Sequence, residues 1–151
     1  MLKKQAPGEN ILKVGGMLLL FLGVLLAFGS GNTLSLVMRG SSDSTVVGYL
    51  NQNSMTYSQL VASNVMVLVA GVIYLAAGVV GVKQAGKVEN AGLCVGMGGL
   101  LIAEVVAEVI VTMIFGDFNL ASVIRMLIFP AIYMVGAVLN WQAKNTYKKI
   151  F

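Results

Sequence analysis

Two glutamates, Glu104 and Glu108, lie four residues apart inside an apolar run that is long enough to cross a lipid bilayer. A carboxylate near the centre of such a run costs about 2.5–3.5 kcal/mol on insertion scales, if Glu behaves as Asp does. Residues four apart share one face of a helix. We therefore expect both side chains to point into a helix bundle or an oligomer interface, where carboxyls bind protons or cations or pair with a basic group.

Arg125 is the basic group best placed to pair with these acids. The turn before it is short, so the runs that hold Glu108 and Arg125 should be antiparallel neighbours. At about 1.5 Å per residue, the two residues differ in depth by only about 5 Å, which a long arginine stem can span. The sequence predicts Arg125 as the charge partner of Glu108, and leaves Glu104 as the deeper candidate for proton or cation binding.

Pro130 follows Arg125 by a little more than one helical turn. Proline lacks a backbone N–H and its ring disfavours the normal helical bond to the carbonyl four residues earlier, here that of Met126. We therefore predict a helix kink at Pro130, close to the two carboxyls.

A series of small residues precedes the glutamates in the same run: Gly92, Gly96, Gly99 and Ala103. In lipid, helices gain contact chiefly where small side chains let two backbones approach closely. These four residues are therefore predicted to pack against another helix. Their spacing fits a helix of the same bundle and a helix of another subunit equally well.

The elements that position these residues are long apolar runs. Hydrophobic residues make up 58% of the 151-residue chain and charged residues 11%, which is typical of a protein that resides in lipid. The runs are continuously apolar, without the alternation of a membrane strand, so helices are favoured over a barrel. We predict an all-α, four-transmembrane-helix bundle forming a single domain over 1–151. The expected spans are 14–38, 60–82, 91–115 and 121–141.

The first run also has features of a secretory signal peptide. Lysines precede it, and the small-residue stretch 27–29 resembles a cleavage site. Apolar character resumes at 34–38, so we favour a membrane span.

Topology follows from the basic residues that flank the spans. Arg39 lies beside the expected loop 39–59, whereas lysines concentrate at the opposite span ends: Lys3, Lys4, Lys13, Lys83, Lys87, Lys144, Lys148 and Lys149. The positive-inside rule therefore places both termini and the tail 142–151 in the cytoplasm, and the loop 39–59 outside. The net charge of +4 comes from lysines at the span ends, where they set the topology and contact lipid headgroups. The charge therefore does not indicate a nucleic-acid partner, and we expect none. Compact loops suit a bacterial cytoplasmic membrane.

Cysteine and histidine chemistry is nearly absent, because Cys94 is the only thiol and the chain has no histidine. An internal disulfide is impossible, and sites that need histidine ligands or a histidine base are excluded. We expect no metal, no cofactor and no enzymatic activity. Two functions remain. One is an accessory or assembly subunit, in which the Glu/Glu/Arg cluster structures the bundle or a complex, with a second copy or another membrane subunit as partner. The other is a small proton- or cation-linked transporter or channel that uses Glu104 as its titrating carboxyl.

Overall fold

The computed structural model describes residues 6–115 and 119–150, and within them the chain is all-helical. Five α-helices follow one another in the order α1 (Glu9–Arg39), α2 (Ser44–Gln52), α3 (Tyr57–Gln84), α4 (Ala91–Phe115) and α5 (Leu120–Ile150), with a short 3₁₀ helix, η1 (Val88–Asn90), before α4. The described residues contain no strand. The all-α prediction is therefore confirmed.

Four of these helices are long and apolar enough to cross a membrane: α1, α3, α5 and η1 together with α4. Each of the four expected runs falls within one of them, although the helices extend further than the apolar residues do. Residues 142–150, expected as a tail, continue α5, since Gln, Ala and Lys are good helix formers. The loop expected at 39–59 contains α2.

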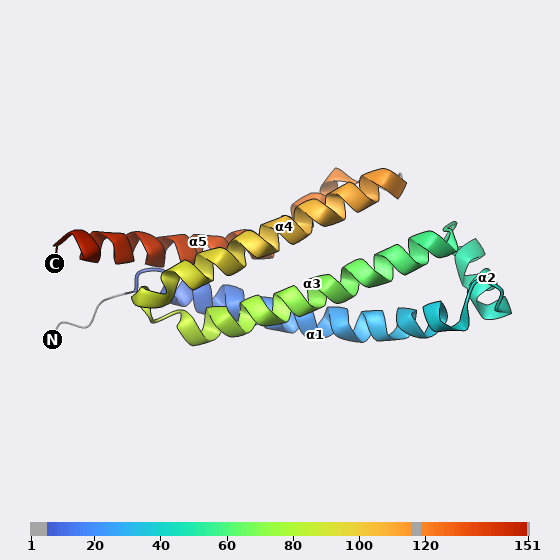
Figure 1. Cartoon of the computed structure of the whole chain (residues 1–151), viewed down its shortest axis with the longest axis horizontal. Helices are drawn as coiled ribbons and strands as arrows, with labels where there is room; N and C mark the ends of the chain where they lie inside the picture. Colours follow the sequence, from blue (N-terminus) through green and yellow to red (C-terminus); the bar gives the residue numbers. More distant parts are fainter. Residues whose placement is uncertain (1–5, 116–118, 151) are drawn as a thin grey trace.

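The long helices form an elongated bundle (Figure 1). Helix α1 packs most extensively on α3, and α4 packs on α5; smaller contacts join α1 to α5 and α3 to α4. Helix α1 begins and α5 ends at the same end of the bundle, whereas α2 lies at the opposite end, where it connects α1 to α3 (Figure 1).

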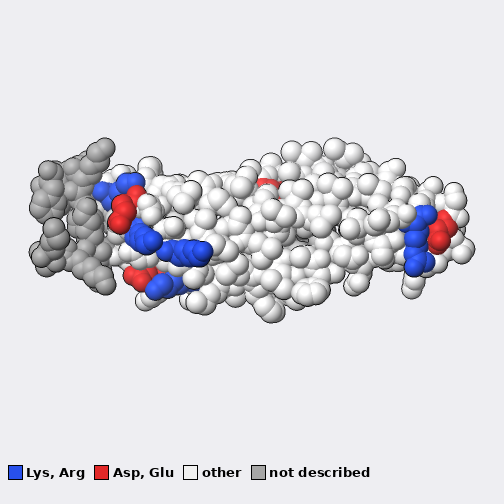
Figure 2. Space-filling view, turned by 60° about the horizontal axis from the view of Figure 1, so that its bottom comes forward, with Lys and Arg blue, Asp and Glu red and all other residues white. Residues whose placement is uncertain are grey.

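On the face shown in Figure 2, charged side chains gather at the two ends of the bundle and leave most of the surface between them uncharged. One end, here called the lysine end, carries the start of α1, the α3–α4 connection and the last turns of α5, with Lys13, Lys83, Lys87 and Lys144. Lys3 and Lys4 lie outside the described residues. The sides of the bundle expose large apolar residues such as Phe28 and Ile114, which are 75% and 73% exposed. Apolar helices with apolar outer faces suggest a membrane-spanning protein.

Asp43 explains why a helix begins inside the expected loop. Its carboxylate accepts hydrogen bonds from the backbone N–H groups of Thr45, at 2.8 Å, and Val46, at 3.3 Å, and so caps the start of α2. The Thr45 donor above all holds the pKa of Asp43 below its ordinary value. At the other boundary of this connection, Gly40 has a φ of 85°, which glycine adopts readily and which ends α1 at Arg39.

Glycines let the helices touch in the half of the bundle near the lysine end. A Cβ added at Gly78 of α3 would lie 2.7 Å from the carbonyl oxygen of Gly16 in α1. One added at Gly136 of α5 would lie 2.6 Å from the backbone nitrogen of Leu12. Tyr133 is completely buried in this half. The half near the lysine end is therefore closely packed.

Asn140 joins three segments at the lysine end. Its side chain is 1% exposed. Its Oδ1 accepts a hydrogen bond from the backbone N–H of Gly8, and its Nδ2 donates one to the carbonyl of Ala85, both at 2.8 Å. This one amide therefore connects the segment before α1, the end of α3 and the helix α5.

Replacing Asn140 with leucine should lower the free energy of unfolding by about 2–6 kcal/mol. The change leaves a buried N–H and a buried C=O without partners, at about 1–3 kcal/mol each. Unfolding in mixed micelles with increasing denaturing detergent measures this. Asn145→Leu is the matched control, because Asn145 is exposed on the same helix. Equal effects of the two substitutions would show that the Asn140 bonds contribute nothing to stability.

Candidate functional site

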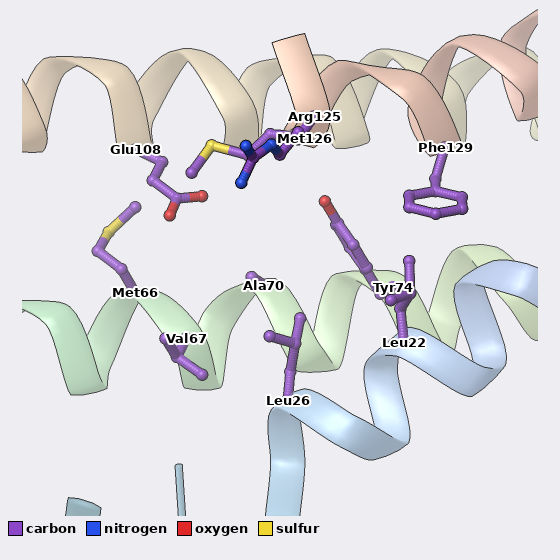
Figure 3. A pocket seen from close by; sticks show the side chains of 10 residues that line it. All are labelled: Leu22, Leu26, Met66, Val67, Ala70, Tyr74, Glu108, Arg125, Met126 and Phe129. Carbon is purple, nitrogen blue, oxygen red and sulfur yellow. The ribbon is translucent and has the colours of Figure 1, made fainter. Parts of the chain in front are cut away.

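A cavity of about 260 Å³ lies among the four long helices. Its walls are mostly apolar, and their polar groups are the side chains of Tyr74, Glu108 and Arg125 (Figure 3). The residues that line it are Leu22, Leu26, Met66, Val67, Ala70, Tyr74, Glu108, Arg125, Met126 and Phe129.

Glu108 of α4 and Arg125 of α5 both face this cavity, as the antiparallel arrangement of their helices predicts. Among the described residues, however, neither side chain takes part in an ion pair with N···O within 4.0 Å or in a hydrogen bond. The structure thus brings the expected charge partners to one cavity without direct contact. Arg125 is exposed, whereas Glu108 is partly buried.

Glu104 lies one helical turn nearer the lysine end than Glu108. Its side chain is 4% exposed, and neither carboxyl oxygen has a hydrogen-bond partner within the described part of the chain. Glu104 does not line the cavity itself, but it lies one helical turn from Glu108, which does. Buried polar groups are normally hydrogen-bonded, and the carboxyl of Glu104 is an exception.

Pro130 is buried within α5, one residue beyond the cavity-lining Phe129. Helix α5 continues through it. Because proline has no N–H, the carbonyl of Met126 loses its usual helical donor, and the side chain of Met126 lines the cavity. The kink at Pro130 stays a prediction.

Two more cavities adjoin the first on the side of α2. One, of about 110 Å³, shares Met66, Val67 and Glu108 with it and extends to Gln59 near the start of α3. The other, of about 260 Å³, shares Val67 with both and is lined by Asn64, whose Oδ1 is buried without a hydrogen-bond partner among the described residues. The α2 half of the bundle is therefore hollow where the lysine half is closely packed.

The small-residue series of α4 does not pack within the described chain. Gly92, Gly96, Gly99 and Ala103 are all exposed. A Cβ added at any of the three glycines would meet no atom within 4 Å. The packing glycine of α4 is instead Gly98, whose added Cβ would lie 2.8 Å from the methyl carbon of Met134. The series is called the α4 ridge below.

Three residues of α3 that line the cavity were not predicted from the sequence, although their spacing is regular. Met66, Ala70 and Tyr74 follow one another at intervals of four, so they share a helix face. In a run where nearly every residue is apolar, this spacing does not separate a cavity wall from a lipid-facing surface. Only Tyr74 is distinguished by residue type.

Fold and site together define a class of protein: a bundle of four long apolar helices whose interior holds a cavity with an acidic and a basic side chain and, beside it, a second buried acid. Comparison with protein-family models, curated proteins and solved structures gives no match to this chain. Function is therefore argued from the site alone.

Proposed function

We propose that this protein crosses a bacterial cytoplasmic membrane four times, with both termini in the cytoplasm. The concentration of lysines at one end of the bundle supports this orientation, because basic residues are retained on the cytoplasmic side. The lysine end then faces the cytoplasm, and α2 faces outward.

Within that membrane we propose a small proton- or cation-linked transporter or channel, in which Glu104 is the titrating carboxyl. One observation carries the proposal: Glu104 is buried beside a charged cavity, and neither of its oxygens has a hydrogen-bond partner among the described residues. A carboxyl retained for structure alone would be paired or hydrogen-bonded, since an unpaired buried charge is costly. A carboxyl that binds and releases a proton must not be held in a permanent ion pair or hydrogen bond.

The hollow half of the bundle supports the same role. Its cavities lie on the side of α2, so Glu108 is approached from outside, while close packing at the lysine end separates it from the cytoplasm. A carrier must be open to one side at a time. Release on the other side then requires the closely packed helices to separate.

Carbodiimide labelling of the membrane-embedded protein tests this function. The apolar reagent modifies protonated carboxyls in apolar surroundings, and mass spectrometry locates the label. We expect label on Glu104 that fades as the pH rises from 5 to 9. The exposed Glu89 is the internal control and should stay unlabelled. If neither Glu104 nor Glu108 reacts at any pH, both are locked in place and the proposal falls.

A second candidate, the accessory or assembly subunit, is favoured by the α4 ridge. Its open glycines would let the backbone of a neighbouring helix approach closely, and a second copy of this chain is the simplest occupant. Native mass spectrometry from lipid nanodiscs should then show dimers, which Gly99→Leu removes. Gly29→Leu is the control, because Gly29 of α1 is equally open. A wild-type protein that is wholly monomeric would contradict this role for the ridge.

A further inference from the structure

We propose that the cavity between Glu108 and Arg125 binds a small aliphatic zwitterion, an α-amino acid with an apolar side chain. Its ammonium group would lie at Glu108 and its carboxylate at Arg125. This inference rests on the proposed transport function and names its substrate class.

The separation of the two charges is the first argument. Glu108 and Arg125 line one cavity from adjacent helices but do not form an ion pair. In apolar surroundings each charge gains from a counter-charge, and a charge left unpaired there is costly. A molecule with both signs satisfies both side chains, whereas a simple cation or anion satisfies only one. Arg125 lines the cavity, so an anionic group inside it can reach the guanidinium.

The arrangement of the lining supplies the second argument. In Figure 3 the charged groups of Glu108 and Arg125 lie on one side of the cavity, and Leu22 and Phe129 lie on the other. The hydroxyl of Tyr74 points toward the charged side (Figure 3). A ligand that fits this lining has a charged head and an apolar body.

Cavity size gives the third argument. A volume of about 260 Å³ corresponds to roughly nine water molecules at ~30 Å³ each. A solute with about that number of non-hydrogen atoms matches this volume, which favours a small molecule over a peptide or a drug-sized ligand. Leucine has this size and this division between a charged head and an apolar body.

Three probes with one carbon skeleton separate the possible charge classes. L-leucine carries both charges, 3-methylbutylamine only the ammonium group, and 4-methylpentanoate only the carboxylate. Binding to the full-length protein in nanodiscs is measured with radiolabelled L-leucine and by competition with the other two. We expect leucine to bind at least about tenfold more tightly than either single-charge probe. An amine that binds as well as leucine, an acid that does so, or no binding of leucine would each overturn the proposal.

Two variants separate loss of a charge contact from loss of folding. Glu108→Gln should weaken leucine and the amine but leave the weak competition by the acid unchanged. Arg125→Gln should weaken leucine and the acid and leave the amine unchanged. A folding defect would weaken all three probes together, and circular dichroism detects it directly. If both variants bind leucine as well as the wild type does, the assigned contacts are wrong.

Failure of this inference differs from failure of the proposed function. Carbodiimide labelling that fades with pH, without leucine binding, would leave the titrating carboxyl intact and reject the substrate class. Leucine binding without any carbodiimide reaction would support the substrate class and reject the proton-linked mechanism.

Discussion

Replacing Glu104 with methionine should stabilise the bundle and at the same time stop proton exchange. Methionine has a similar unbranched shape, and it removes a buried carboxyl that has no hydrogen-bond partner among the described residues. Because no favourable contact of the carboxyl is lost, we expect the free energy of unfolding to rise by about 1–3 kcal/mol. A gain in stability combined with a loss of activity is what removal of a functional group produces.

Two measurements on the same preparation check this expectation. Detergent-induced unfolding gives the free energy of unfolding. A pH-sensitive dye inside proteoliposomes reports proton movement when L-leucine is added. Glu89→Met, at an exposed position of the lysine end, should change neither. A Glu104→Met protein that is less stable or no longer assembles would instead identify Glu104 as a structural contact and favour the assembly role.

Gly78→Ala should destabilise the protein by about 1–3 kcal/mol, whereas Gly99→Ala should not destabilise it at all. At Gly78 the added methyl group would lie 2.6 Å from the Cγ of Leu20 and 2.7 Å from the carbonyl oxygen of Gly16, so α1 and α3 must move apart. At Gly99 the methyl group meets no atom within 4 Å, and alanine favours the helix by about 1 kcal/mol.

The same unfolding assay, applied to the two variants side by side, decides this. Both substitutions add one methyl group to a glycine in a long apolar helix, so each controls for the other. Destabilisation by Gly99→Ala, with Gly78→Ala near neutral, would mean that the α4 ridge and not the α1–α3 contact holds the helices together.

The four long helices could be predicted from the sequence, because an apolar run indicates a helix without reference to the rest of the chain. A run of about twenty apolar residues must satisfy its own backbone hydrogen bonds in lipid, and a helix does this without a partner. The residues at which helices begin and end were less well predicted. Residues 142–150 continue α5 after the apolar character stops, and Asp43 starts a helix within the expected loop.

Contacts between helices were harder to predict, because they depend on helix rotation. When a helix is apolar all round, no polar face shows which side is buried. Gly98 and Gly99 are adjacent in the sequence, yet one packs against Met134 and the other is open. For Glu108 and Arg125 residue counts predict a similar depth along the helices, and both residues line one cavity. The gap between their side chains depends on how far apart the helices lie, which residue counts do not give.

The contrast between a hollow half and a closely packed half has an electrical consequence. A membrane potential falls mainly across low-dielectric material, so when water fills the cavities near α2, most of the voltage drops between Glu104 and the lysine end. In the proposed orientation, a proton that reaches Glu104 from outside would then have crossed little of the field. Its release toward the lysine end would be driven by about 2.3 kcal/mol per 100 mV, so voltage would accelerate the release step and leave binding nearly unaffected.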